Sequence, residues 1–264
     1  MSEHIIAFLM GCLEGLTEFL PVSSTGHLIL LGHFLSFTGE KAKVFEVVIQ
    51  LGAILAITVL YFKRYLSLLD FKHAKTQLNL LHVVLGMLPA SIVGLIFHDF
   101  IKEHLFSEKT VIWGLFFGAI LMIFADFRQK KTTTPQTDDL DKLTYKQALY
   151  IGIFQCLALY PGFSRSGSTM SGGMLSNVDK KTAADFSFFI GAPMMVAATG
   201  LDLLKSYKYL SMDDIGIFVI GFLTAFAVAM VSVITFLKVL KKIPFSYFAY
   251  YRIIVAVVLF FILF

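Results

Sequence analysis

"EGLTEFLPVSSTGH", residues 14–27, places two carboxylates and an imidazole inside a very apolar chain. Of the 264 residues, 57% are hydrophobic and only 15% are charged, and the mean hydropathy is +0.79. Because a soluble domain carries about 25% charged residues, this composition predicts a polytopic membrane protein. Ionisable residues inside such a protein are costly and mark functional sites. The stretch therefore bears on both the fold and the function.

Six apolar stretches are long enough to cross a bilayer, which takes about 20 helical residues. They are residues 44–62, 78–97, 110–127, 182–204, 215–237 and 243–264. The N-terminus does not have the pattern of a cleavable signal, because it lacks a basic region and Glu14 interrupts the apolar run.

Two further apolar stretches, 7–32 and 148–175, are interrupted by "LPVSSTGH" and "YPGFSRSGSTMSGG". A proline removes a backbone donor and blocks the preceding turn, so a helix that enters either stretch has to stop there. Broken helices at membrane depth occur where the backbone is buried in protein or lines a wet cavity. We therefore expect two re-entrant helix hairpins that return to the side from which they enter.

The distribution of lysine and arginine supports this topology. Fourteen basic residues lie in the loops that would share one face, 63–77, 128–146, 176–181 and 238–242. Six lie in the opposite loops, 33–43, 98–109 and 205–214. The positive-inside rule then places the first group in the cytoplasm and both termini outside.

The two halves of the chain are related. An ungapped shift of 141 residues aligns 7–60 with 148–201 and gives twelve identities in 54 positions, with glycines and a serine matching at the breaks. Each half holds one hairpin and three spans, an odd number, which predicts an inverted-topology repeat. We expect an all-α membrane domain over 1–264, with halves of about 1–127 and 143–264 joined by the polar cytoplasmic linker 128–142.

Glu14 and Glu18 are four residues apart, which places both carboxylates on one helix face. Two like charges in an apolar setting repel each other unless a cation lies between them. Mg²⁺ and Ca²⁺ bind carboxylate oxygens, and substrate phosphate often completes the coordination shell. We expect Glu14 and Glu18 to hold such a cation. The alternative is a structural pair that shares a proton or is neutralised by an arginine.

Hydroxyl groups follow Pro21. Ser23, Ser24 and Thr25 can cap the helix that resumes near Gly26, and its free N–H groups form a cradle for an anion. His27 lies three residues after Ser24, on the same helical turn. Its imidazole could therefore act as the base for a Ser24 nucleophile. Capping alone is the structural alternative for Ser23 and Thr25, and a core histidine for His27.

Arg165 is the only charged residue between Lys146 and Asp179, and it lies in the second break. Its planar guanidinium suits bidentate phosphate binding. Gln155 occupies the repeat position of Glu14, so the acidic pair is not duplicated. The predicted site is therefore asymmetric, with the acids and the base from the first half and the cation from the second.

Other polar groups carry less information. Cys12 and Cys156 have no metal or redox spacing and are expected to pack in apolar segments. The basic residues are spread among loops rather than gathered in a patch, so we expect no nucleic-acid partner.

The motifs "EGLTEFLPVSSTGH" and "PGFSRSG" resemble the signatures of the bacterial undecaprenyl-diphosphate phosphatases, also called bacitracin-resistance proteins. The resemblance extends over essentially the whole chain. It implies removal of the terminal phosphate from undecaprenyl diphosphate, which regenerates the lipid carrier for peptidoglycan and other cell-wall polymers. It also implies divalent-cation dependence, bacitracin resistance, and a multi-pass protein of the bacterial inner membrane with a site open to the periplasm.

Carried over by position, the resemblance gives Ser24, His27 and Glu18 catalytic roles and assigns the metal to Glu14 and Glu18. Diphosphate binding is expected from a larger set: Arg165, Ser23, Thr25, Gly26, Ser164 and Ser166. In the expected mechanism Ser24 attacks the terminal phosphorus and His27 takes its proton. The reverse arrangement, with His27 as the nucleophile or as the base for water, stays open, and a homo-oligomer is compatible with the pattern.

Two other classes of protein deserve comparison. Type-2 phosphatidate phosphatases have a nucleophilic histidine six residues after the arginine, where this chain has Ser171, so they are disfavoured. A polyprenyl-phosphate flippase or secondary transporter is the alternative function, because inverted repeats with broken helices are a transporter architecture.

Overall fold

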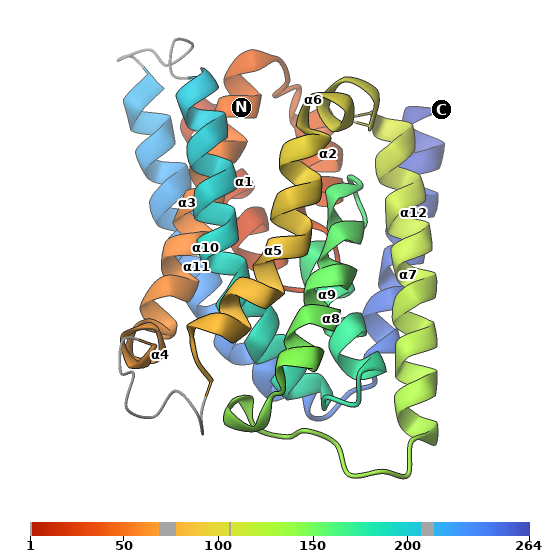
Figure 1. The fold of residues 1–264 in the computed structure, drawn as a ribbon. Helices are drawn as coiled ribbons and strands as arrows, with labels where there is room; N and C mark the ends of the chain where they lie inside the picture. Colours follow the sequence, from red (N-terminus) through yellow and green to blue (C-terminus); the bar gives the residue numbers. More distant parts are fainter. Residues whose placement is uncertain (1, 69–77, 106, 207–213) are drawn as a thin grey trace.

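Helices make up most of the chain that this computed structural model describes, namely residues 2–68, 78–105, 107–206 and 214–264 (Figure 1). The helices of the first half are α1 (Glu3–Thr17), α2 (Ser24–Leu35), α3 (Glu40–Leu60), α4 (Phe62–Ser67), α5 (Leu80–Ile96), α6 (His98–Phe100), a π-turn (Ile101–Leu105) and α7 (Glu108–Lys131). After a short 3₁₀ turn (Leu140–Lys142), the second half holds α8 (Tyr145–Gln155), a 3₁₀ turn (Cys156–Leu159), α9 (Arg165–Leu175), α10 (Lys180–Ser206), α11 (Ile215–Leu240) and α12 (Ser246–Leu263).

The prediction of a multi-pass membrane protein agrees with the helix lengths. Within the described residues five helices, α3, α7, α10, α11 and α12, are long and apolar enough to cross a membrane. A sixth span is reached only if α5 is counted together with His98–Leu105, which bends away from it by 73°. The 17 residues of α5 extend about 26 Å, somewhat less than the hydrocarbon core of a bilayer.

Both predicted breaks are present. The first helix ends at Thr17, five turn residues and Ser23 follow, and α2 starts at Ser24. In the second half α8 ends at Gln155, a 3₁₀ turn follows, and α9 starts at Arg165. Each of the predicted stretches is therefore a helix, a break and a second helix.

The backbone of the two breaks follows the repeat. Among described residues other than glycine, four have a positive φ: Ser23 (69°), Ser36 (52°), Ser164 (74°) and Asn177 (65°). Ser23 and Ser164 are 141 residues apart, as are Ser36 and Asn177. Positive φ is uncommon for such residues, so this pairing reflects one backbone path used twice, before and after the second helix of each break.

Helices are exchanged between the halves. The most extensive contacts of α1, in the first half, are with α11 of the second half. The most extensive contacts of α8, in the second half, are with α5 of the first half. Glycines permit these close approaches, because a Cβ on Gly11 would lie 2.6 Å from the Gly221 carbonyl oxygen, and one on Gly152 would lie 2.5 Å from that of Leu85. Gly11 and Gly152 are themselves repeat partners, so the first helix of each half packs against the other half.

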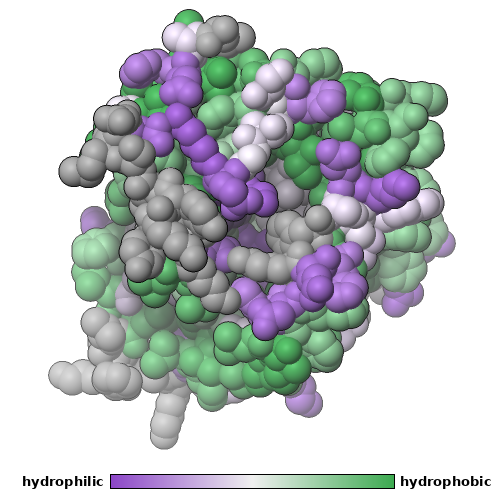
Figure 2. Space-filling model, turned by 90° about the horizontal axis from the view of Figure 1, so that it is seen from above, coloured by the Kyte–Doolittle hydropathy of each residue, from purple (hydrophilic) through white to green (hydrophobic). Residues whose placement is uncertain are grey.

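The two ends of the molecule differ. Figure 1 places both termini at one end and the linker between α7 and α8 at the other. The linker is tied to the turn after α9, since the Thr137 N–H donates to the Asn177 carbonyl at 2.9 Å and the Asp179 N–H donates to the Thr137 carbonyl at 3.0 Å. Figure 2 views the end with the termini and shows hydrophilic residues bordering a central hollow, with apolar residues around the periphery. Of the loops used to assign the topology, residues 69–77, 106 and 207–213 lie outside the described residues.

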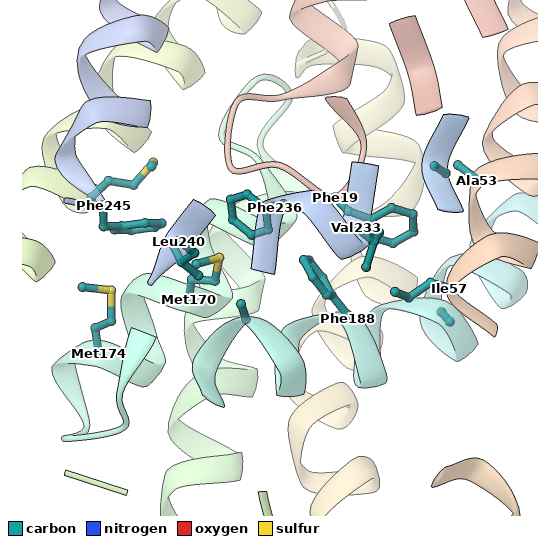
Figure 3. Packing of buried hydrophobic residues seen from close by; sticks show 14 of the residues in the cluster. Phe19, Ala53, Ile57, Met170, Met174, Phe188, Val233, Phe236, Leu240 and Phe245 are labelled. Atoms are coloured by element: carbon teal, nitrogen blue, oxygen red, sulfur yellow. The ribbon is translucent and has the colours of Figure 1, made fainter. Parts of the chain in front are cut away.

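The largest buried cluster packs directly against the first break (Figure 3). Phe19, between the break residues Glu18 and Leu20, is fully buried, and its ring meets that of Phe188 from α10 edge to face at 5.5 Å. Edge-to-face pairs of this kind add to the energy of burial. The apolar side chain of Phe19 thus anchors the break and fixes where the neighbouring polar side chains point.

Candidate active site

A cavity of about 200 Å³ lies between the two breaks. Six of the predicted site residues line it: Glu18, Ser23, Ser24, Thr25, Ser164 and Arg165. The remainder of the wall comes from Gln50, Ala158, Leu159, Pro161, Gly162 and Met195. The structure therefore brings residues about 141 positions apart into one polar cavity. This agrees with the predicted asymmetric site, in which an acid from the first half meets a cation from the second.

The Glu18 carboxylate connects the two halves of this cavity. Its Oε2 accepts a hydrogen bond from the Ser24 hydroxyl at 2.6 Å, and its Oε1 lies 3.4 Å from Nη2 of Arg165. The Glu18 side chain is only 7% exposed, so this ion pair is largely shielded from solvent. A carboxylate in this position can accept the proton of a serine that becomes a nucleophile.

The guanidinium of Arg165 is held on several sides. Its Nη1 donates to the Ser187 carbonyl at 3.1 Å, and its Nη2 contacts the sulfur of Met195 at 3.2 Å. The guanidinium carbon also lies 5.5 Å from the centre of the Phe19 ring. Gly191 lets the group pass close to α10, since a Cβ there would collide with it. These contacts hold Arg165 in place at the edge of the cavity.

Serines of the second break join the two breaks. The Ser166 hydroxyl donates to the Leu20 carbonyl at 2.9 Å. Ser164 is the N-cap of α9, and its side chain accepts from the Gly167 N–H at 3.2 Å. Ser164 and Ser166, which the sequence analysis predicted as diphosphate-binding residues, thus each make a structural hydrogen bond in this structure.

The first break differs from the second at its cap. Ser23 is the N-cap residue of α2, but its side chain makes no capping hydrogen bond. Ser23 and the exposed Thr25 both line the cavity. Gly26 is buried beside Leu115 of α7, where a Cβ would lie 3.1 Å from the Leu115 Cδ1. The N-terminal turn of α2 therefore has no side-chain acceptor of its own, as an anion cradle needs.

His27 does not contact Ser24 through a hydrogen bond in the described structure. Its Nδ1 lies 2.8 Å from the Ser23 carbonyl oxygen, and its Nε2 lies 2.7 Å from the hydroxyl of Tyr251 in α12. The rings of His27 and Tyr251 are stacked, with centroids 5.5 Å apart. The partner of the Ser24 hydroxyl is Glu18 instead, six residues earlier and across the break.

Arg252 is buried completely and supports the second break from behind. Its Nη2 donates to the carbonyls of Gly114, Gly162 and Phe163 at 3.1, 3.0 and 2.9 Å. The last two of these residues belong to the break, and the first belongs to α7. Arg252 therefore ties the loop that carries Ser164 and Arg165 to the helix behind it.

Glu14, one of the two predicted cation ligands, does not line the cavity and is buried beside Glu18. It is 1% exposed, and neither of its carboxylate oxygens has a hydrogen-bond partner. Glu18 and Glu46 lie close enough to interact with it electrostatically. Burial of unpaired carboxyl groups is unfavourable, and a bound cation would offset it. No group of three or more potential ligands is assembled among the described residues, so such an ion would take two carboxylates, Glu14 and Glu18, and complete its shell with phosphate or water.

Besides Arg252, two residues in or beside the site were not predicted as members of it. Gln50 lines the cavity, and its Oε1 accepts from the Thr199 hydroxyl at 3.3 Å. A glutamine inside an apolar span is a signal that the sequence did contain. Tyr251 had no such signal, because a tyrosine near the start of a membrane helix is ordinary.

Broken helices that meet at a buried acid, a hydroxyl and an arginine define an integral membrane protein with an internal polar site. The chain matches the family model described as bacitracin resistance protein BacA over residues 7–258. It is 59% identical over 260 residues, 97% of either chain, to proteins named undecaprenyl-diphosphatase 1 from Bacillus thuringiensis, Bacillus anthracis and Bacillus cereus. The chain therefore belongs to the BacA bacitracin-resistance family.

Proposed function

We propose that this protein hydrolyses undecaprenyl diphosphate to undecaprenyl phosphate and inorganic phosphate, and so confers bacitracin resistance by recycling the lipid carrier. The observation that carries the proposal is the short hydrogen bond from the Ser24 hydroxyl to Glu18, whose other oxygen faces Arg165. The family match and the names of the similar proteins support the same reaction. They do not favour a flippase or transporter.

In the proposed reaction, Arg165 and the N-terminal N–H groups of α2 bind the diphosphate, with the hydroxyls of Ser23 and Thr25 beside it. The Ser24 oxygen attacks the terminal phosphorus while its proton passes to Glu18, and the bond to the bridging oxygen breaks, so undecaprenyl phosphate leaves. Water then cleaves the phosphoserine, which releases inorganic phosphate and restores the Ser24 hydroxyl. In this second step Glu18 returns its proton to the Ser24 oxygen, the water supplies the hydroxyl of inorganic phosphate, and the remaining proton of the water passes to solvent.

The proposal includes a divalent cation, Mg²⁺ or Ca²⁺, held by Glu14 and Glu18. When bound, it would neutralise charge on the diphosphate and stabilise undecaprenyl phosphate as the leaving group. The orphaned, buried carboxylate of Glu14 supports this assignment.

We also propose that the protein lies in the bacterial inner membrane as six spans and two re-entrant hairpins, α1–α2 and α8–α9, in an inverted repeat. The paired positive-φ positions and the exchanged helices support the repeat. The excess of basic residues in the loops around the linker supports a cytoplasmic position for that end. The site would then open toward the periplasm, at the end where Figure 2 shows the hollow.

The test is release of inorganic phosphate by purified protein in detergent, with undecaprenyl diphosphate and Mg²⁺ or Ca²⁺. We expect turnover that stops with a chelator and returns when the cation is added back. A phosphoserine trapped by rapid acid quench and lost in Ser24→Ala would identify the nucleophile. Absence of phosphate release under all these conditions would overturn the proposed function, because detergent removes any gradient on which a transporter would depend.

A further inference from the structure

The imidazole of His27 is fully engaged by its two neighbours. The Ser23 carbonyl oxygen, 2.8 Å from Nδ1, can only accept a hydrogen bond, so Nδ1 must carry the hydrogen. In the neutral ring Nε2 is then an acceptor, and the Tyr251 hydroxyl donates to it at 2.7 Å. The lone pair that a base would use is thus already occupied by Tyr251.

The second half of the chain makes the same bond with a different side chain. Ser168, the repeat partner of His27, donates from its hydroxyl to the Ser164 carbonyl at 2.8 Å. Ser164 is the repeat partner of Ser23, and the two have similar backbone conformations, with φ of 74° and 69°. One side-chain donor, four residues beyond the N-cap, therefore holds the N-cap carbonyl in each break.

These N-cap residues need holding because their conformation is strained for a residue with a Cβ. In the second break, the Ser164 side chain also caps α9, so two side-chain bonds fix this cap, beside the backbone bond from the Ser168 N–H to the Ser164 carbonyl. In the first break the Ser23 side chain makes no capping bond. The hold on Ser23, and through it on the direction of Ser24, comes from His27.

We propose that His27 is a positioning residue whose Nδ1–H fixes the Ser23 carbonyl, and that Tyr251 sets the tautomer that makes this possible. The structure gives the serine proton to Glu18, and His27 holds the N-cap that aims Ser24 at Glu18. This inference rests on the proposed phosphatase reaction only where activity is measured, and its geometric part stands independently.

Substitutions of His27 that keep or remove a hydrogen-bond donor to the Ser23 carbonyl distinguish a positioning role from a role as catalytic base. His27→Asn places an amide N–H where Nδ1 lies, and His27→Ser copies the bond made by Ser168. We expect both to keep at least roughly a tenth of wild-type kcat, with the pH profile of kcat/KM unchanged in shape. We expect His27→Ala, which has no donor, to lose on the order of a hundredfold, the scale of the cost of a misplaced reacting group. If the Asn and Ser variants are as inactive as Ala, or if a limb of the pH profile disappears, His27 is the base and the inference is wrong.

A second measurement does not depend on activity. Nitrogen-15 NMR of histidine-labelled protein, with the His27 signals assigned by their loss in His27→Asn, reports the tautomer directly. We expect the Nδ1–H form at pH 7 in the wild type, and a shift of the Nε2 signal in Tyr251→Phe. An Nε2–H ring in the wild type would refute the positioning role even if the variants did not fold. Inactive wild-type protein with an Nδ1–H ring would instead sink the phosphatase proposal and leave the hold on Ser23 intact.

Discussion

Arg165 of the second half reaches to within 3.4 Å of Glu18 of the first, across 147 positions of sequence. Neither group is placed by its own helix alone. Phe19 anchors the acid in the buried cluster, while Ser187 and Met195 of α10 hold the guanidinium. The distance between Glu18 and Arg165 therefore depends on how the two breaks are placed relative to each other.

Replacement of Glu18 by Gln should abolish most of the phosphate release. Glutamine keeps the size of the side chain but cannot take the Ser24 proton, and general-base groups contribute about 10²–10⁴-fold. We expect kcat to fall within that range. The comparison is Glu3→Gln, whose carboxylate pairs with Lys41 at the surface and should leave turnover unchanged. Near-normal kcat in Glu18→Gln would remove Glu18 from the mechanism.

Arg165→Lys should lose almost as much activity as Arg165→Ala. Lysine keeps the charge, but it cannot reach the Ser187 carbonyl and the Glu18 carboxylate together as the planar fork does. Removing a group that stabilises developing charge costs about 10²–10³ in rate, and kcat/KM for undecaprenyl diphosphate is the quantity to follow. Lys109→Ala, at an exposed position of α7, serves as the charge control. A fully active lysine variant would show that charge alone is sufficient.

Glu14→Gln should shift the requirement for the cation rather than remove the nucleophile. If Glu14 and Glu18 share the ion, the variant should need on the order of tenfold more Mg²⁺ or Ca²⁺ for half-maximal turnover, which corresponds to about 1.4 kcal/mol. A cation titration of phosphate release at fixed substrate measures this. An unchanged midpoint would place the ion elsewhere and leave the buried Glu14 as a structural residue.

Arg252→Met should destabilise the fold. Methionine fills a similar volume, but the carbonyls of Gly114, Gly162 and Phe163 lose their donor, and buried unsatisfied groups cost about 1–3 kcal/mol each. We expect a drop of at least about 6 °C in the thermal midpoint, taking about 1 kcal/mol for each of the three carbonyls and about 2 °C per kcal/mol. A thermal shift assay in detergent is sufficient. A midpoint equal to that of the wild type would show that the second break does not depend on Arg252.

Gly11→Ala and Gly152→Ala should each destabilise the exchange of helices between the halves. The new Cβ would meet backbone oxygens at 2.6 and 2.5 Å, and overpacking of this kind costs about 1–3 kcal/mol. Gly200→Ala in α10 is the matched control, because no atom lies within 4 Å of its Cβ position. The control should match or slightly exceed the wild type in thermal midpoint. Equal midpoints for all three variants would contradict the close packing.

Much of the architecture could be predicted because proline, glycine and hydropathy act locally. Pro21 and the "YPGF" stretch predict where helices stop, and the apolar runs match the helices within a few residues. The predicted span at 78–97 differs from the others, since its helix is short and the chain bends sharply after Phe97. The bend depends on residues between α5 and α7 that hydropathy treats as ordinary loop.

The partners within the site were harder to predict. The spacing of Ser24 and His27 correctly predicted that the two lie on one helical turn. Helical spacing does not predict contacts across a break, and the hydrogen bond between Ser24 and Glu18 is such a contact. Tyr251 and Arg252 reach the site from α12, more than 80 residues after Arg165. Their roles follow only from tertiary packing, which one sequence without its fold does not contain.

The exchange of helices between the halves has a consequence for biosynthesis. When α1 to α7 have left the ribosome, the main partner of α1, which is α11, has not yet been made. The first break, with its acids and hydroxyls, is therefore in the membrane without its main packing partner until the C-terminal half has been synthesised. A chain truncated after α10 would contain every residue of the cavity, but it would lack the surface that holds α1 in place.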